Sequence, residues 1–196
     1  ASMKYALWAI LALSLLVGFN AMSNYNGFVA MEETVDEQWA NVETQYQRRF
    51  DLIPNLVATV KGVADFEKST LTAVTEARAS AFNAMKAVGD GTGSIADFQR
   101  SNMVLGGAMN GMLGYSERCP ELKANQNFSD LQAQLEGTEN RITVARKDFN
   151  GAVKGYNGSV RRFPGAFWAS MFGFDQREYF ESVAGSEAAP AVDFGA

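Results

Sequence analysis

The chain has 196 residues, a formal net charge of −5, a single cysteine and no histidine. The absence of histidine excludes Ser-His-Asp and Cys-His catalysis and histidine-ligated metals, and the lone Cys119 excludes an intramolecular disulfide and a CxxC redox pair. The acidic balance argues against a nucleic-acid surface, which needs clustered lysine and arginine. We therefore expect no catalytic residues, no cofactor, no metal and no nucleic-acid partner.

Residues 1–23 are predicted to form a membrane anchor. From Tyr5 to Phe19 all residues but two are apolar, and no charge occurs between Lys4 and Glu32. These fifteen residues would span about 22 Å as a helix, against a bilayer core of about 30 Å. A buried core helix and a cleaved signal peptide are the alternatives. A tryptophan near the start of the segment, and the lack of small residues at the cleavage positions, favour a retained anchor.

The charges that flank this segment predict its orientation. Lys4 is the only charged side chain before it, whereas Glu32 and Glu33 are the first charged residues after it. Positive flanking charge prefers the cytoplasmic side of a membrane. We therefore expect a single-pass membrane protein whose remaining residues lie outside the cytoplasm.

Residues 24–162 are predicted to form a helical bundle, because their apolar residues recur at steps of three and four. A second helix is expected to begin at Asp51, with Pro54 in its first turn and the first helix ending just before it. A glycine-rich loop at 89–93 precedes the third helix, and the fourth covers residues 128–160. The predicted fold class is all-α: an N-terminal transmembrane helix that continues into a long up-and-down antiparallel helical bundle.

The fourth helix has the longest unbroken apolar seam, typical of a bundle or coiled coil. Its members are Phe128, Leu131, Leu135, Thr138, Ile142, Ala145, Phe149, Val153, Tyr156 and Val160. Polar residues lie beside this seam and near the start of the second helix, and nine are candidates for a structural cluster: Arg48, Arg49, Asp51, Asn55, Glu136, Glu139, Asn140, Arg141 and Arg146. We interpret them as inter-helix ion pairs and hydrogen bonds that fix register. A carboxylate metal site, an acid–base pair and a ligand-binding groove are the alternatives.

Residues 163–181 are an aromatic C-terminal segment that begins at a helix-stopping proline. Two interpretations are open: the aromatic side chains close the end of the bundle, or they lie at headgroup level, because the last helix of such a bundle returns toward the anchor. The membrane-interface candidates are Arg161, Arg162, Trp168, Phe172 and Phe174. Residues 182–196 are rich in alanine, glycine and serine and are predicted to be a disordered tail.

Recognisable motifs occur in most parts of the chain. They are RRFDLIPNLVATVKG at 48–62, TEARA at 75–79, CPELKANQNF at 119–128, LEGTENRI at 135–142 and YNGSVRRFP at 156–164. In this order they resemble the LemA family of bacterial membrane-associated proteins, except that a tyrosine usually stands where this chain has Cys119. The resemblance implies an N-terminal anchor, a helical bundle and no established enzymatic activity. Family members linked to cell-envelope processes and to magnetosome membranes favour a scaffold over a catalyst.

The expected function is that of a non-enzymatic, membrane-anchored structural scaffold of the bacterial cell envelope. Apolar residues left over beside the main stripe of the first helix, and in the aromatic segment, predict self-association. The other expected partners are membrane lipid and a helix of another envelope protein. The alternative, from another class, is a membrane-bound sensor or ligand-binding module that uses the polar cluster on the last long helix, around Glu139 and Arg141.

Overall fold

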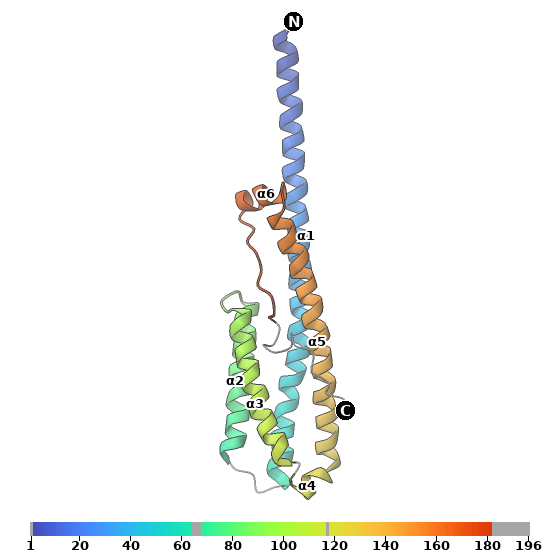
Figure 1. The fold of residues 1–196 in the computed structure, drawn as a ribbon, viewed down its shortest axis with the longest axis vertical. Coiled ribbons are helices and arrows are strands. Elements are labelled where there is room, and N and C mark those ends of the chain that lie inside the picture. Colours follow the sequence, from blue (N-terminus) through green and yellow to red (C-terminus); the bar gives the residue numbers. More distant parts are fainter. Residues whose placement is uncertain (1, 64–67, 117, 182–196) are drawn as a thin grey trace, which may run out of the picture.

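The computed structural model describes residues 2–63, 68–116 and 118–181, and this described part contains helices and no strand (Figure 1). The helices are α1 (Ser2–Val63), α2 (Lys68–Gly89), α3 (Ile95–Ser116), α4 (Pro120–Lys123), α5 (Gln126–Arg161) and α6 (Gly165–Phe172). The predicted all-α class is confirmed. The predicted tail at 182–196 lies outside the described residues.

The longest helix, α1, forms the axis of the molecule, and its first part stands alone above the other helices (Figure 1). α5 packs beside the rest of α1, and the hairpin of α2 and α3 packs against the lower part. α4 lies at the lower end, and α6 lies at the upper end of α5 against α1. The chain therefore runs down α1, up α2, down α3 and up α5, as predicted for an up-and-down bundle.

Apolar side chains of α1 and α5 meet along one continuous seam. The buried residues of α1 are Phe28, Val35, Val42, Tyr46, Phe50, Ile53, Leu56 and Val60. Their steps of three, four and seven are the spacing of coiled-coil packing. On α5 every residue of the predicted seam is buried except Leu131, which is partly buried against the same core. The predicted seam of the last long helix is confirmed.

The turn between α2 and α3 is short and tightly packed. Gly91 adopts a φ of 70°, in the left-handed region that glycine enters without strain. A Cβ on Gly93 would lie 2.7 Å from the Ala87 side chain, so only glycine fits there. The Asp97 backbone N–H donates to the Ser94 hydroxyl at 3.1 Å, which caps the start of α3. The predicted loop is therefore present, at the upper end of the hairpin (Figure 1).

The predicted helix break beside Asp51 is wrong, because α1 continues through Pro54 to Val63. Proline has no backbone N–H, so the Phe50 carbonyl lacks the donor that residue 54 normally supplies in an α-helix. Arg78 of α2 provides one: its Nε donates to the Phe50 carbonyl oxygen at 2.6 Å. A donor from a neighbouring helix leaves no trace in the local pattern, which is why Pro54 resembles a helix start in the sequence.

Removing the Arg78 donor should destabilise the fold to an extent that depends on Pro54. We expect Arg78→Met to lower the free energy of unfolding by about 1.5–3 kcal/mol, the usual effect of losing a hydrogen bond from a charged group. In a Pro54→Ala background the restored N–H supplies the carbonyl, so the same substitution should cost at least about 1 kcal/mol less. Thermal and urea unfolding followed by circular dichroism measure both losses. Equal losses in the two backgrounds would contradict this role of Arg78.

Candidate functional site

The upper end of the bundle is a junction between α6 and α1, and residues 161–172 are called the collar here. The Trp168 indole Nε1–H donates to the Asn20 side-chain oxygen at 2.8 Å. Gly165 allows the chain to turn closely over the end of α5, because a Cβ there would clash with the Ser159 carbonyl oxygen. These contacts fix α6 on α1 just after the apolar segment that was predicted to be the anchor.

Aromatic side chains strengthen this junction. Tyr25 meets Phe172 and Phe174 edge-on, with ring centroids 5.3 and 5.5 Å apart. Phe174 also packs against Phe28 at 5.2 Å, and Phe172 stacks on Trp168 at 5.8 Å. Each such pair contributes about 0.5–1.5 kcal/mol beyond the burial of its surface. The three aromatic residues predicted to lie at the membrane interface therefore all contact aromatic neighbours at the end of the bundle.

The most exposed apolar side chains of the collar are not the predicted ones, of which Phe172 is 38% exposed. Phe163 is 90% exposed, Phe167 55% and Met171 59%, whereas Trp168 is only 9% exposed. The predicted interface residues Arg161 and Arg162 are exposed, and neither forms an ion pair within the described part of the chain. The sequence pattern did not reveal which side of the short α6 faces outward.

Above the collar, α1 has the composition of a membrane span. It contains a window that is long and apolar enough to cross a membrane, and none of that window is buried in the structure. Large apolar side chains of this part of α1 are between 48% and 77% exposed. They include Met3, Leu7, Trp8, Ile10, Leu13, Leu16, Val17 and Phe19. An exposed apolar surface of this extent normally marks contact with a membrane or another protein. The predicted anchor therefore coincides with the part of α1 that the bundle leaves uncovered.

Residues 173–181, called the strap here, leave α6 and descend toward the turn between α2 and α3 (Figure 1). Gly173 begins the strap with a φ of 78°, again in the left-handed region. The following residues are neither helical nor part of a strand. Because buried backbone N–H and C=O groups need hydrogen-bond partners, the strap must find them on other elements.

Two asparagines of α5 supply such partners. The Asn157 side-chain amide donates to the Arg177 carbonyl and its oxygen accepts from the Arg177 N–H, both at 2.9 Å. Asn150 forms the same pair of bonds with the Phe180 backbone, again both at 2.9 Å. Asn150 and Asn157 are seven residues apart, so they lie on one side of α5 two turns from each other. The strap is thus held against α5 through its main chain.

A glutamine of α3 repeats the arrangement on the other side. Gln99 donates to the Glu181 carbonyl at 2.9 Å and accepts from the Glu181 N–H at 3.0 Å. The Glu178 carboxylate accepts from the Ile95 backbone N–H at 2.9 Å, at the start of α3. The strap therefore joins the α2–α3 hairpin to the α1–α5 pair.

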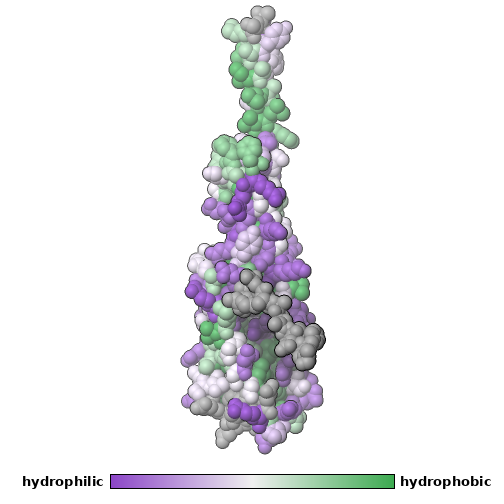
Figure 2. All heavy atoms as spheres, in the orientation of Figure 1, coloured by the Kyte–Doolittle hydropathy of each residue, from purple (hydrophilic) through white to green (hydrophobic). Residues whose placement is uncertain are grey.

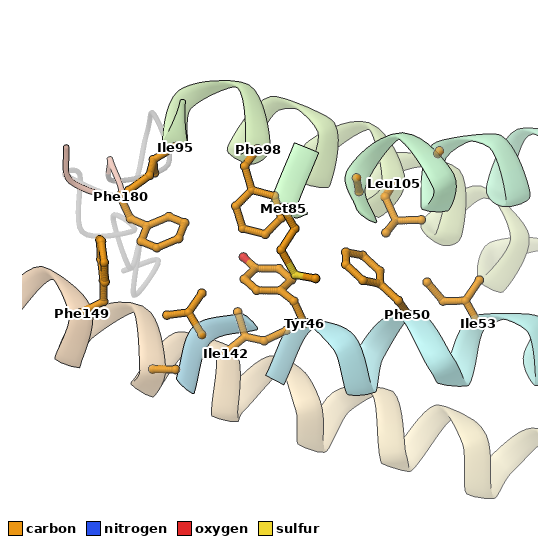
Figure 3. Close-up of a cluster of buried hydrophobic side chains, with 14 of the residues drawn as sticks. Tyr46, Phe50, Ile53, Met85, Ile95, Phe98, Leu105, Ile142, Phe149 and Phe180 are labelled. Atoms are coloured by element: carbon orange, nitrogen blue, oxygen red, sulfur yellow. The ribbon is translucent and has the colours of Figure 1, made fainter. Parts of the chain in front are cut away.

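Phe180 gives the strap a side chain in the hydrophobic core. It is 4% exposed and contacts Trp39 of α1, Phe98 of α3 and Phe149 of α5, with ring centroids 6.1, 6.2 and 5.5 Å apart. Figure 3 shows Phe180 between Phe98 and Phe149, with Tyr46 further along the same core. Burying a phenylalanine of this kind is typically worth about 3–5 kcal/mol against alanine.

The charged groups around the strap are less deeply placed. Arg177 pairs with Asp36 at 2.7 Å and with Glu32 at 3.4 Å, and all three side chains are at least 39% exposed. Exposed pairs of this kind contribute little stability, about 0–1 kcal/mol. Arg146 donates to the Glu181 carbonyl at 3.2 Å and lies over the Phe180 ring, 4.8 Å from its centroid. The strap is thus held in place by side-chain amides and the Phe180 ring more than by ion pairs.

The nine predicted cluster residues are not gathered into one buried site. Arg49 and Glu139 form an ion pair at 2.9 Å between α1 and α5, with Arg49 14% and Glu139 56% exposed. Arg146 contacts the strap instead. The other members, Arg48, Asp51, Asn55, Glu136, Asn140 and Arg141, are exposed. They occupy the outward positions of α1 and α5, because the inward ones belong to the apolar seam.

Two buried tyrosines have perturbed ionisation. Burial raises the pKa of the Tyr46 hydroxyl, and the neighbouring Arg146 and Arg49 guanidinium groups oppose that rise only in part. Burial also raises the pKa of Tyr156, and the Glu32 carboxylate raises it further. Both groups therefore stay neutral at physiological pH and serve as packing residues with a polar tip.

A cavity of about 740 Å³ opens between α1, the turn between α2 and α3, and the strap. The Trp39 Nε1–H faces Gly89 without a hydrogen-bond partner, and a Cβ on Gly89 would lie 3.4 Å from that nitrogen. The charged lining residues are Asp36, Glu43, Asp90, Glu178, Lys86 and Arg177. No group of three acidic, cysteine or histidine side chains able to hold a metal ion occurs within the described residues.

A second, shallower hollow of about 360 Å³ lies between α1 and α5. Asn140 and Arg141 of the predicted cluster line it, together with Gln38, Asn41 and Gln45. Two members of the predicted polar cluster therefore line this hollow.

A helix that contains a segment apolar enough to cross a membrane, and that continues into a bundle closed by a strap, defines the class: a membrane-associated helical-bundle protein. The chain belongs to the LemA family, whose model matches residues 38–194. Magnetosome protein MamQ 2 of Paramagnetospirillum magneticum is 28% identical over 197 residues, which covers 90% of this chain and 72% of the relative. Magnetosome protein MamQ of Magnetospirillum gryphiswaldense is 27% identical over 192 residues, covering 88% and 70%. The resemblance stated from the motifs is confirmed.

The sequence interpretation missed the residues that hold the strap. Asn157 is almost fully buried, at 3% exposed, and a buried amide needs partners for both its donor and its acceptor groups. The signal was available, because Asn150 and Asn157 follow the apolar seam residues Phe149 and Tyr156 at the same seven-residue interval. The sequence did not show which residues these two amides bind, since the strap has no periodic pattern.

Replacing an asparagine that binds the strap should loosen it locally. We expect Asn150→Leu to lower the hydrogen-exchange protection of the Phe180 and Glu181 amides at least tenfold, because a tenfold change corresponds to about 1.4 kcal/mol, within the usual effect of losing such bonds. The control is Asn110→Leu, at an exposed position of α3. Hydrogen exchange followed by mass spectrometry measures both. Unchanged protection of the strap in Asn150→Leu would show that its other contacts hold it without the Asn150 amide.

Proposed function

We propose that this protein is a non-enzymatic, membrane-anchored scaffold of the bacterial cell envelope, which holds its bundle upright on the bilayer and associates with further copies. The observation that carries the proposal is the continuity of α1, a single helix of 62 residues from the uncovered apolar segment into the bundle core. A hinge between anchor and bundle would let the bundle tilt freely. A continuous helix transmits the orientation of the anchor to the whole domain.

The dimensions of α1 support a spacer role. From Asn24 to Val63 the helix rises about 60 Å, at about 1.5 Å per residue. α5 packs along this part, and the strap fastens the α2–α3 hairpin to the same pair. The lower end of the bundle is thus presented at a set distance from the membrane. The relatives named as magnetosome proteins support a role in building or maintaining a cellular structure.

The outward face of α3 supports self-association. No charged residue occurs between Arg100 and Glu117, and Met103 and Val104 are 59% and 65% exposed. A Cβ placed on Gly107 or Gly111 would meet nothing within 4 Å. An uncharged helix face with small residues four apart allows another helix to approach closely.

Blocking this face should prevent assembly without weakening the fold. We expect Gly107→Leu combined with Gly111→Leu to convert oligomers of the detergent-purified full-length protein into monomers, while helix content stays equal or rises, because leucine favours a helix over glycine by roughly 0.5–1 kcal/mol per site. Light scattering and circular dichroism measure the two effects. The control is Gly151→Leu on the exposed surface of α5. Oligomers that persist in the double variant, or a wild type that is monomeric, would contradict self-association through α3.

The cavity beside the strap favours a second candidate function, a sensor or ligand-binding module. Its unpartnered Trp39 Nε1–H and its mixed charges suit a polar ligand better than an apolar one. The two functions are distinguished by native mass spectrometry of the purified protein. A monomer that retains a small molecule, and loses it in a Gly89→Leu variant, would favour the ligand-binding module over the scaffold.

The flanking charges support a bundle outside the cytoplasm, because Lys4 precedes the apolar segment and Glu32 and Glu33 follow it. We expect protease added to intact spheroplasts to digest the bundle down to a membrane-protected fragment. An antibody against residues of α5 would show the loss of full-length protein. Complete protection until the membrane is opened would place the bundle in the cytoplasm.

A further inference from the structure

The turn from α5 into α6 presents an unusual combination of side chains at the end of the bundle nearest the uncovered part of α1. Arg161 and Arg162 are exposed and have no ion-pair partner among the described residues, in a chain with a net charge of −5. Phe163 follows them at 90% exposed. Unpaired cations beside an exposed aromatic ring are typical of the interfacial zone of a membrane.

The apolar surface of the collar lies close to that of the anchor. Phe19 and Met22 on α1 are 75% and 65% exposed, and Phe167 and Met171 on α6 are 55% and 59% exposed. Figure 2 shows hydrophobic surface along the free part of the molecule and again at the collar, with mainly hydrophilic surface below. The bundle thus has one strongly apolar end, and it is the end that the anchor enters.

The apolar end of the bundle compensates for the short length of the anchor. The uninterrupted apolar run of residues 5–19 spans about 22 Å as a helix, and its extension to Met22 about 27 Å, so the anchor is roughly 3–8 Å shorter than a bilayer core of about 30 Å. A helix that lies across the end of the bundle adds about its own diameter, roughly 10 Å with side chains. Seating α6 in the interface therefore removes the mismatch that a short anchor would otherwise impose on the bilayer.

Directly at the collar, a hollow of about 280 Å³ separates α1 from the turn between α5 and α6. Its polar lining comes from Ser23, Asn24, Ser159 and Arg162, and none of the described residues that line it is acidic. Hydroxyl, amide and guanidinium donors without a competing carboxylate are the groups that bind a phosphate.

We propose that the collar is a docking surface for anionic phospholipids, with Arg161 and Arg162 binding the headgroup phosphates and Phe163, Phe167 and Met171 inserted among the upper acyl chains. The proposal rests on the membrane anchoring of α1. It adds a second contact with the bilayer, beside the anchor, so that the tilt of α1, which the continuous helix passes on to the bundle, is held at two points. The Trp168 bond to Asn20 couples the two contacts.

The test uses full-length protein with Cys119→Ser, reconstituted into vesicles of phosphatidylcholine alone or mixed with phosphatidylglycerol. A nitroxide is attached at Leu11→Cys, Phe167→Cys or Val144→Cys, and its collisions with oxygen and with a water-soluble nickel chelate are compared. We expect the Leu11 label in lipid, the Val144 label in water, and the Phe167 label in lipid, several-fold more shielded from the chelate when phosphatidylglycerol is present.

Charge variants test the arginines. Arg161→Gln with Arg162→Gln should abolish the effect of phosphatidylglycerol on the Phe167 label, whereas Arg48→Gln with Arg141→Gln, which removes the same charge from exposed positions of the bundle, should preserve it. If both double variants lose the effect of phosphatidylglycerol equally, the effect depends on net charge alone, and the arginine site is overturned. If the Phe167 label is in water while the Leu11 label is in lipid, the docking of the collar on lipid is overturned but the anchoring of α1 stands. A Leu11 label in water would overturn the anchoring itself.

Discussion

The hydrogen bond from Arg78 to the Phe50 carbonyl matters beyond its own energy, because it occurs where Pro54 leaves α1 without a donor. A proline in the interior of a helix normally kinks or ends it, at a cost of about 3 kcal/mol or more. Here a neighbouring helix satisfies the freed carbonyl, and the apolar seam continues past it through Ile53, Leu56 and Val60. The same contact fastens α2 to α1. The bond thus accompanies the continuation of α1 past Pro54 to Val63, at the lower end of the bundle.

The strap closes the upper end of the core, which the helices alone do not cover. The α2–α3 hairpin packs against the lower part of α1, and without the strap the upper end of the core would lie open between that hairpin and the α1–α5 pair. Phe180 fills that space, and reciprocal amide pairs with Asn150, Asn157 and Gln99 satisfy the backbone that carries it. Because these pairs contact the main chain, they depend little on the side chains of the strap residues they bind. The specific requirements lie at Phe180 in the core, at Phe174 against Tyr25 and Phe28, and at Gly173 with its positive φ.

The parts of this fold that the sequence predicted are those governed by periodicity. The seam of α5 was readable because buried residues recur every three or four positions over a long helix, and the apolar segment of α1 that the bundle leaves uncovered was readable because it lacks charge. The break at Asp51 was misread because the compensating donor, Arg78, is in another helix. The collar was only partly readable: in a helix as short as α6, the pattern does not show that Trp168 turns toward Asn20 while Phe167 turns outward. The strap has no period, so its partners emerge only from the tertiary structure.

The central claim is that one continuous helix holds the bundle upright on the membrane, and the native cysteine permits a direct measurement. Cys119 precedes α4 at the end of the bundle farthest from the anchor (Figure 1). A donor dye on Cys119, with acceptor dyes on the lipid headgroups of a vesicle, reports the height of that end by energy transfer. An upright bundle predicts a height of about 60 Å, from the rise of α1 below the collar. A control with Cys119→Ser and Ser23→Cys should give a height near the headgroups. A Cys119 height of roughly 20 Å, about two helix diameters, would mean that the bundle lies flat and would contradict the account.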